Sequence, residues 1–370
     1  MKTPPVGASA READEFWMSR AIALARRAEG MTRPNPAVGA VVVANGQCVG
    51  EGFHRRAGGP HAEVYALRQA GPRARGATLY VTLEPCSTYG RTPPCCDAVL
   101  QAGIARVVVG VADPNPRHAR RAFRLLKKHG TAVTVGVCKE AAADLLAPFA
   151  CTMLRHHPYF SLKLAVSLDG RIADSTYSSR WISSPASRTL VQEMRRSSDA
   201  ILVGAGTLLH DNPSLWPRPD KGRNPWRVIM AGQRPLPLDA RVFTDGHADR
   251  TLVVLPERAQ PRAVQTLRKR GVSVLETPKS ADALSALSDH LLSLGVMKVL
   301  CEGGGQLAAS LVKAGLADEF CVFLAPVLVG GPVSAVGNAA WPLAEAPRFR
   351  LKESRPVGPD LFLRYAPIRP

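Results

Sequence analysis

His61-Ala62-Glu63, Thr82-Leu83-Glu84-Pro85-Cys86 and Pro93-Pro94-Cys95 mark the stretch from which the fold of this chain can be predicted. The histidine and the two cysteines suit Zn²⁺, and three protein ligands leave a fourth position for water, as in catalytic zinc sites. The apolar run at 77–83 predicts a buried strand that ends just before Cys86, whereas His61 and Cys95 each begin a predicted helix. We therefore expect the three ligands to meet beside helix N-termini at one edge of a sheet.

Glu63 lies two residues after His61 and is a candidate proton carrier rather than a metal ligand. Zinc deaminases carry H-x-E followed by P-C-x-x-C, and their glutamate acts as general acid and base. In this chain the second half is longer, because Cys95 follows Cys86 by nine positions. We expect the helix dipole to favour an ionised Glu63. Two alternatives stay open: Cys96 as a fourth ligand would make the zinc site structural, and the cysteines could be inert core thiols.

The motifs H-A-E at 61–63, T-L-E-P-C-S at 82–87 and G-R-T-P-P-C-C at 90–96 closely resemble those of the bifunctional riboflavin-biosynthesis deaminase/reductase family. The long spacing between the cysteines separates this family from cytidine and tRNA deaminases. The resemblance extends from about Asp14 to Pro370 and implies that the chain begins with a cytidine-deaminase-like three-layer α/β/α domain. It also implies the metal ligands His61, Cys86 and Cys95, a catalytic Glu63, and a substrate contact at Asn35.

The length of 370 residues and the alternation of strands and helices predict two α/β domains. We expect a flexible tail at 1–13, a zinc-dependent deaminase domain at 14–150 and a linker at 151–158. A second α/β domain should occupy 159–370.

Two glycine-rich turns follow predicted strands in the second domain, at 204–206 and 303–305. The first, a Gly-x-Gly, indicates by itself only a tight turn. The second stands between a predicted strand and a predicted helix, where backbone N–H groups can bind a phosphate. The surrounding sequence resembles the reductase half of the same family, which has a dihydrofolate-reductase-like fold and uses NADPH. The resemblance implies cofactor contacts at Ala165, Trp181, Thr207, Asp211 and Gly304. It implies substrate contacts at Ser179, Arg195, Leu215, Arg218 and Glu302, with Lys163 as a candidate to polarise the ribosyl C1′.

The resemblance also implies two consecutive reactions. The first is zinc-dependent hydrolytic deamination of 2,5-diamino-6-(5-phosphoribosylamino)pyrimidin-4(3H)-one, and the second is NADPH-dependent reduction of the ribosyl group to ribityl. The residues alone indicate only hydrolytic deamination of an amino-heterocycle. In the first domain, Thr88-Tyr89 lacks a usual histidine and 117–121 lacks usual glycines. In the second domain, Trp216 replaces a common threonine, Ala231-Gly232 an Asp-Ser pair, and Gly305-Gln306 a Pro-Thr pair. These departures leave open a deaminase whose reductase domain has degenerated.

The composition is that of a globular protein, with 46% hydrophobic residues and no apolar run near the ~20 residues of a membrane span. Eight irregularly spaced cysteines and an N-terminus without an apolar signal core favour free thiols in a cytoplasmic protein. The formal charge of +18 suits phosphorylated metabolites as well as nucleic acid, but no nucleic-acid-binding motif accompanies it. We therefore expect a homo-oligomer that acts on a small molecule, with no nucleic-acid or membrane partner. A nucleic-acid base deaminase and a non-catalytic zinc protein remain the alternatives.

Overall fold

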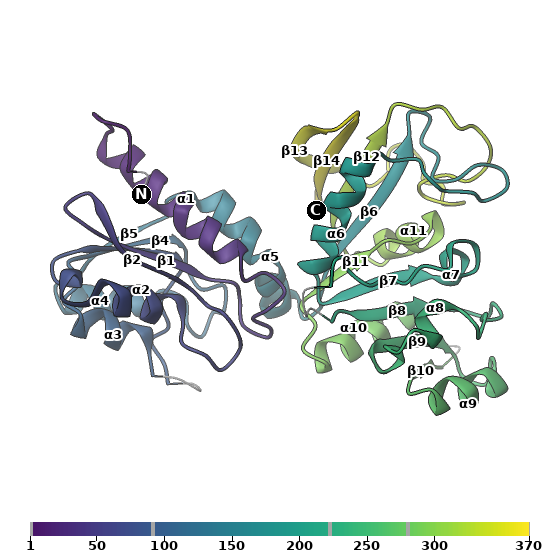
Figure 1. Cartoon of the computed structure of the whole chain (residues 1–370), viewed down its shortest axis with the longest axis horizontal. Coiled ribbons are helices and arrows are strands. Elements are labelled where there is room, and N and C mark those ends of the chain that lie inside the picture. The colour runs from purple at the N-terminus through teal and green to yellow at the C-terminus, as the bar shows by residue number, and fades with distance from the viewer. Residues whose placement is uncertain (1–2, 90–92, 221–223, 279–281, 370) are drawn as a thin grey trace. The chain divides into compact units, whose positions relative to one another are not determined.

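The computed structural model describes residues 3–89, 93–220, 224–278 and 282–369. The chain forms two compact units, Met1–His156 and His157–Pro370 (Figure 1). The division falls inside the segment that the sequence led us to expect as a linker. Part of the second cysteine motif, Gly90-Arg91-Thr92, lies outside the described residues.

The first unit contains a five-stranded mixed sheet in the order β2-β1-β3-β4-β5. The strands are β1 (Gly39–Ala44), β2 (Gln47–Phe53), β3 (Thr78–Leu83), β4 (Arg106–Val111) and β5 (Ala132–Val135). β1 runs antiparallel to both neighbours, whereas β3, β4 and β5 are parallel. The parallel strands are rich in valine, as expected where both faces of a sheet are covered.

Helices cover both faces of this sheet. α1 (Ala10–Arg26) and α5 (Lys139–Arg155) lie on one face, and α2 (Ala62–Ala70), α3 (Cys95–Gln101) and α4 (Arg121–Lys128) lie on the other (Figure 1). Because successive side chains of a strand point to opposite faces, β1 and β3 contribute to both hydrophobic cores. The three-layer α/β/α architecture predicted for this part of the chain is confirmed.

The terminal helices of this unit extend into the segments that we expected as the tail and the linker. α1 begins inside the expected tail because Ser9 and Glu12 form a capping box: the Ser9 amide donates to Glu12 Oε2 at 2.8 Å, and the Glu12 amide donates to Ser9 Oγ at 3.3 Å. α5 continues to Arg155, through most of the expected linker, and ends where His156 adopts a left-handed conformation at φ 54°.

Two glycines of β2 allow α2 to pack directly on the sheet. A Cβ atom at Gly50 would lie 2.1 Å from the carbonyl oxygen of Ala66, and one at Gly52 would lie 2.6 Å from that of Ala62. His61 is the N-cap residue of α2, and Glu63 lies in its first turn. The close packing therefore fixes how far these two side chains stand from the sheet.

The second unit contains a nine-stranded sheet in the order β10-β9-β8-β7-β11-β6-β12-β14-β13. The strands are β6 (Tyr159–Ser167), β7 (Ala200–Gly204), β8 (Trp226–Met230), β9 (Thr251–Pro256), β10 (Ser273–Thr277), β11 (Lys298–Cys301), β12 (Ala317–Ala325), β13 (Phe349–Val357) and β14 (Asp360–Pro367). The strands from β10 to β12 in this order are parallel, and β14 and β13 are antiparallel additions. We did not expect β13 from the sequence, because it is mostly exposed and lacks an apolar pattern.

Helices cover both faces of the parallel part of this sheet. They are α6 (Pro185–Arg196), α7 (Ala205–Asp211), α8 (Arg241–Thr244), α9 (Pro261–Lys269), α10 (Ala283–Ser293) and α11 (Gly305–Lys313). α10 and α11 pack on one face, and α7, α8 and α9 pack on the other. The carboxyl ends of β7, β8 and β11 thus meet at one edge, which is where α/β sheets bind ligands.

Candidate functional site

The three predicted metal ligands lie together in the first unit. His61 Nδ1 lies 3.1 Å from Cys95 Sγ and 3.5 Å from Cys86 Sγ. His61 caps α2, Cys86 follows β3, and Cys95 begins α3, so a strand end and two helix starts bring the ligands together. Around a tetrahedral zinc with bonds of ~2.1 and ~2.3 Å, ligand nitrogen and sulfur atoms lie about 3.5 Å apart. The observed spacing fits this ion.

The ionisation of the two cysteines in this cluster also favours a bound cation. Hydrogen bonds from Cys95 and His61 lower the pKa of the Cys86 thiol to about 4. The Cys86 sulfur and burial raise the pKa of the Cys95 thiol, so that only one of the two sulfurs ionises readily. Zn²⁺ takes both sulfurs as thiolates and the imidazole as a neutral ligand. The donor set therefore fits zinc in chemistry as well as in spacing.

Glu63 is buried beside the cluster, with 3% of its surface exposed. Burial raises the pKa of its carboxyl to about 7, and the nearby Cys86 sulfur adds to the rise. Our expectation that the start of α2 would favour the ionised carboxylate was incomplete, because the loss of solvation outweighs the helix dipole. A carboxyl that titrates near neutrality can both accept and return a proton.

Cys96, the alternative fourth ligand, has a different partner. Its thiol donates to the carbonyl oxygen of Pro85 at 3.9 Å, and burial raises its pKa to about 12. Within the described part of this unit, the side chains that could hold a metal together are His61, Cys86 and Cys95. The geometry therefore favours three protein ligands and a position left for water.

Asn35, expected as a substrate contact, is oriented by a histidine that the sequence analysis missed. Asn35 Nδ2 donates to His54 Nε2 at 3.1 Å, and His54 Nδ1 donates to the carbonyl oxygen of Pro60 at 3.0 Å. Burial lowers the pKa of His54, in agreement with a neutral ring that accepts at Nε2. The His54 ring meets that of His61 edge-on, at a centroid distance of 5.3 Å. Asn35 thus lies close to the metal ligands.

Glu84 is a second residue whose role the sequence analysis missed. Its carboxylate accepts hydrogen bonds from the amides of Asp113 at 3.1 Å, Arg120 at 2.9 Å and Ala122 at 3.1 Å. These bonds join the segment after β4 to the strand end that carries Cys86. The T-L-E-P-C motif contains Glu84, but its partners lie far along the chain and no local pattern indicates them.

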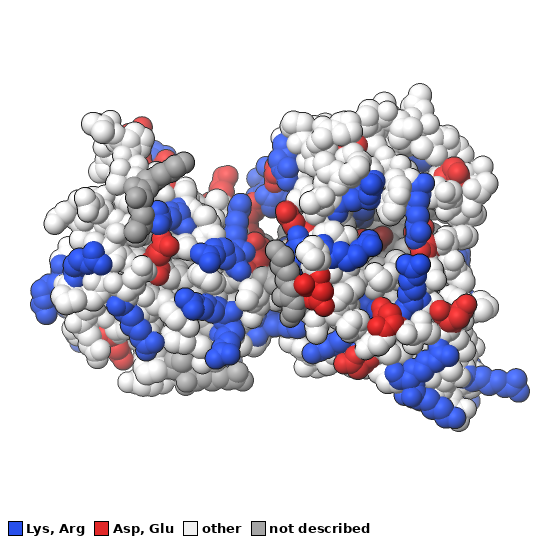
Figure 2. All heavy atoms as spheres, viewed as in Figure 1, with Lys and Arg blue, Asp and Glu red and all other residues white. Residues whose placement is uncertain are grey.

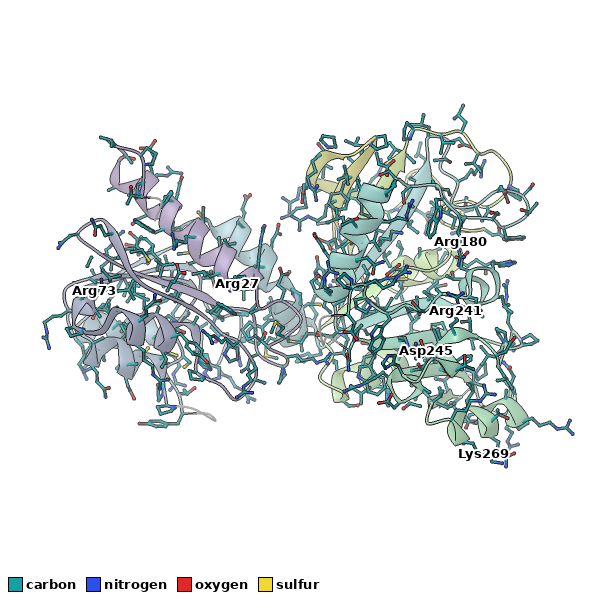
Figure 3. All side chains as sticks on the ribbon, in the orientation of Figure 1. Arg27, Arg73, Arg180, Arg241, Asp245 and Lys269 are labelled. Atoms are coloured by element: carbon teal, nitrogen blue, oxygen red, sulfur yellow. The ribbon has the colours of Figure 1, made fainter. Side chains whose placement is uncertain are left out.

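In the second unit, a cavity of about 1290 Å³ lies at the carboxyl edge of the sheet. All the cofactor and substrate contacts expected for this unit line it: Lys163, Ala165, Ser179, Trp181, Arg195, Thr207, Asp211, Leu215, Arg218, Glu302 and Gly304. Arg180 and Arg241, labelled in Figure 3, line it as well, and neither was expected. The fold therefore gathers into one cavity residues that are spread over more than a hundred positions of sequence.

A buried ion pair lies in this cavity. Arg195 Nε and Nη2 contact the two carboxylate oxygens of Glu302 at 2.5 and 2.8 Å, and the side chains are 12% and 8% exposed. Burial alone would raise the pKa of Glu302, but Arg195 and Lys163 lower it below its ordinary value. Burial lowers the pKa of the Lys163 ammonium, and Glu302 partly offsets this. Two cationic groups and one carboxylate thus surround one point of the cavity.

The expected cofactor and substrate residues are also in contact with one another. Ser179 Oγ donates to Asp211 Oδ1 at 3.1 Å, and the Arg180 guanidinium donates to the backbone carbonyl of Asp211. Trp181 is 65% exposed, and the Arg188 guanidinium lies over its ring at 4.4 Å. An exposed aromatic face with two glycine turns at helix starts suits a dinucleotide with a planar ring and phosphates. The residues of this cavity therefore fit NADPH.

Both halves of the chain match known families. Residues 11–111 match the cytidine and deoxycytidylate deaminase zinc-binding region, and residues 158–363 match the RibD C-terminal domain. The chain is 42% identical over 362 residues to riboflavin biosynthesis protein RibD of Bacillus amyloliquefaciens, covering 96% of each chain. It is 42% identical over 368 residues to RibD of Escherichia coli K12, covering 95% of this chain and 98% of that one.

Solved structures agree with these matches. The structure of Acinetobacter baumannii RibD in its form 1 is 40% identical, with a TM-score of 0.83 and coverage of 96% of this chain and 99% of that one. A Thermotoga maritima diaminohydroxyphosphoribosylaminopyrimidine deaminase/5-amino-6-(5-phosphoribosylamino)uracil reductase is 34% identical, with a TM-score of 0.85 and coverage of 97% and 100%.

The fold and the two sites define an enzyme that joins a zinc-dependent deaminase to an NADPH-dependent reductase. More particularly, the chain belongs to the RibD family of riboflavin biosynthesis proteins. Both the family and the two-part fold expected from the sequence motifs are confirmed.

Proposed function

We propose that the first unit deaminates 2,5-diamino-6-(5-phosphoribosylamino)pyrimidin-4(3H)-one and that the second unit reduces the ribosyl group of the product to ribityl. One observation carries the proposal: a single chain of this family holds both the His61–Cys86–Cys95 cluster and a large cavity with the Arg195–Glu302 pair. The Thermotoga maritima relative is named for both activities.

At the first site, we assign His61, Cys86 and Cys95 as the ligands of Zn²⁺, which when bound supplies the Lewis acid that activates water at neutral pH. Glu63 would accept one proton from the attacking water and pass it to the ring nitrogen, and would then carry the proton of the newly formed hydroxyl to the amino group, which leaves as ammonia. Its pKa of about 7 suits both transfers. Asn35, oriented by His54, binds the pyrimidine.

At the second site, NADPH, when bound, would supply a hydride to the ribosyl C1′, while the bond from C1′ to the ring oxygen breaks and that oxygen takes up a proton. Arg218 offers a forked donor to the ribose phosphate, and Arg195, whose Nε and Nη2 hold Glu302, adds positive charge beside it. Glu302, held by Arg195, accepts hydrogen bonds from ribose hydroxyls. Lys163 lies beside Glu302 and polarises the sugar at C1′. We assign Ala165, Trp181, Thr207, Asp211 and Gly304 to the cofactor, and Ser179 and Leu215 to the substrate.

A coupled assay on the zinc-loaded chain tests both activities at once. Ammonia release from the diaminopyrimidinone ribosyl phosphate reports the first reaction, and NADPH oxidation in the same cuvette reports the second. We expect both signals. Ammonia without NADPH oxidation would mean that Trp216, Gly232 or Gln306 marks a degenerate reductase, and the absence of both signals would reject the proposal.

Removing zinc should separate the two activities. We expect a chelator to abolish ammonia release, because Glu63 then has no activated water to deprotonate. NADPH oxidation with the already deaminated substrate should continue at its full rate, because the residues that line its cavity all belong to the second unit. Added Zn²⁺ should restore ammonia release. Parallel loss of both activities on chelation would contradict the assignment of the metal to the first site alone.

The partner of the enzyme is then a phosphorylated small molecule. Lys and Arg side chains are distributed over both units among Asp and Glu (Figure 2), an arrangement that attracts anionic metabolites. No helix in the described ranges is long and apolar enough to span a membrane. We infer that the enzyme works in the cytoplasm as a homo-oligomer without a nucleic-acid partner. Salt-sensitive RNA binding at micromolar affinity would contradict the last point.

A further inference from the structure

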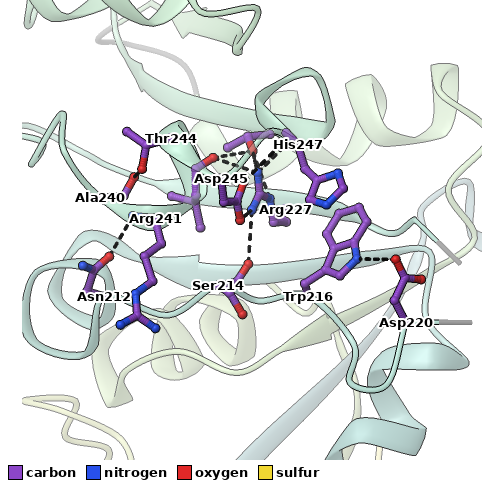
Figure 4. Close-up of polar contacts among 12 residues, drawn as sticks. Asn212, Ser214, Trp216, Asp220, Arg227, Ala240, Arg241, Thr244, Asp245 and His247 are labelled. Carbon is purple, nitrogen blue, oxygen red and sulfur yellow. Dashed lines mark hydrogen bonds and ion pairs between the residues drawn. The ribbon is translucent and has the colours of Figure 1, made fainter. Parts of the chain in front are cut away.

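A fully buried arginine organises one wall of the reductase cavity. Arg227 lies on β8 with its side chain 0% exposed, and its guanidinium pairs with Asp245 at 2.6 Å. It also donates to three backbone carbonyl oxygens: Val242 at 2.8 Å, His247 at 2.7 Å and Ser214 at 3.3 Å (Figure 4). The contact with Ser214 joins the segment 214–218 to β8 and to the loop after α8.

Trp216 packs against the same arginine from within the segment 214–218. Its ring is stacked on that of His247, with a centroid distance of 4.2 Å and an interplanar angle of 5° (Figure 4). The guanidinium carbon of Arg227 lies 5.5 Å from the centroid of the indole, and the indole Nε1 donates to Asp220 at 3.3 Å. Trp216 is only 7% exposed and does not line the cavity, so it touches the site through its neighbours.

The residues on either side of Trp216 face the substrate part of the cavity. Leu215 and Arg218 both line it, and Leu215 is 1% exposed. The carbonyl oxygen of Trp216 accepts from Arg195 Nη1 at 3.5 Å, and the amide of Arg218 donates to Gln192 Oε1 at 2.8 Å. The segment is therefore held on one side by α6 and on the other by Arg227 and the aromatic stack.

The backbone conformation of segment 214–218 also depends on contacts with the surrounding structure. Leu215 has φ 57°, in the left-handed region that a leucine rarely adopts. Such a conformation persists only where the surrounding structure over-determines it. Trp216, the next residue, is stacked on His247 and lies near the Arg227 guanidinium, so its position is fixed by contacts outside the segment.

We propose that Trp216 is a positioning residue of the reductase site, which sets the affinity for the phosphoribosyl substrate by holding Leu215 and Arg218 against it. The inference rests on the proposed function of the second unit. It predicts that the stacking of the indole on His247 contributes to substrate affinity, in addition to the apolar volume that the indole fills. It also predicts that the cofactor is unaffected, because Thr207 and Asp211 belong to the separate helix α7.

The test compares Trp216→Leu, which keeps an apolar side chain but removes the stack, with Trp216→Phe, which keeps an aromatic face. With the deaminated substrate, Trp216→Leu should raise the reductase KM about tenfold, the effect of losing one aromatic pair. Its kcat and its Kd for NADPH should stay within about twofold of the wild-type values, and Trp216→Phe should recover most of the substrate affinity. His247→Leu should raise KM to a similar extent, without a further rise when it is combined with Trp216→Leu.

Trp226→Leu is the matched control. Trp226 begins β8, an arginine lies over its ring at 5.4 Å, and it does not line the cavity. An unchanged KM in Trp216→Leu, or an equal rise of KM in Trp226→Leu, would overturn the inference while leaving the reductase activity established. If Trp216→Leu lowers kcat and the affinity for NADPH as well as raising KM, the substitution disrupts the whole cavity rather than the substrate contacts. That result would also overturn the inference. Absence of NADPH oxidation in the wild-type enzyme would instead reject the proposed function on which the inference rests.

Discussion

Glu63→Gln should reduce the turnover of the deaminase by about 10²–10⁴-fold while zinc stays bound. The amide is nearly the same size as the carboxylate but cannot accept a proton from water or return one to the leaving amino group. Glu63 is buried beside the ligands that we propose for zinc, and its pKa of about 7 matches a group that must do both. Ammonia release measured alongside zinc content by atomic absorption separates loss of proton transfer from loss of the metal.

Asp97→Asn provides a matched control for this variant. Asp97 follows the ligand Cys95 by two positions and lies in the first turn of α3, as Glu63 follows His61 in the first turn of α2. Asp97 is partly exposed, whereas Glu63 is buried, so its amide variant should keep nearly full activity. Persistent ammonia release by Glu63→Gln, or equal damage in both variants, would show that the proton carrier is another group.

The zinc site could be predicted from the sequence because its chemistry depends on residue types that are rarely interchangeable. One imidazole, two thiols and one carboxylate at these spacings already indicate the metal and its acid–base partner. His54 and Glu84 could not be predicted in the same way. Each acts on residues that are near only after folding: His54 on Asn35, and Glu84 on amides beyond β4. Their sequence neighbourhoods carry no pattern that distinguishes them from ordinary buried polar residues.

The same contrast holds for the second unit. Its central strands could be predicted because they are apolar runs bounded by turns, whereas the edge strand β13 is polar and is defined by pairing with β14. Trp216 appeared in the sequence only as a departure from a family pattern. The structure places it against His247 and Arg227. These contacts join segments that are distant along the chain, and no pattern in a single sequence indicates them.

Arg195→Met should lower the free energy of unfolding of the reductase unit by about 3–5 kcal/mol. The substitution leaves the carboxylate of Glu302 largely buried without its main partner. Reductase kcat/KM should fall by about 10²–10³-fold, since the positive charge that we assign to the ribose phosphate and the partner that orients Glu302 are also lost. Urea unfolding followed by tryptophan fluorescence reports the first effect, and NADPH oxidation with the deaminated substrate reports the second. Arg268→Met is the control, because its pair with Glu276 at 2.8 Å is 56% and 29% exposed and should contribute at most about 1 kcal/mol.

The double variant Arg195→Met/Glu302→Met separates stability from function. With both charges gone, two apolar side chains can fill the space of the ion pair, and the free energy of unfolding should return to near the wild-type value. Lys163 then loses the carboxylate that favours its charged form, so its ammonium is left in a cavity that already lowers its pKa. Reductase activity should therefore stay as low as in the single variant, although the unit is stable again. A double variant that regained activity along with stability would mean that Arg195 and Glu302 only support the fold, and that the substrate phosphate and hydroxyls bind elsewhere in the cavity.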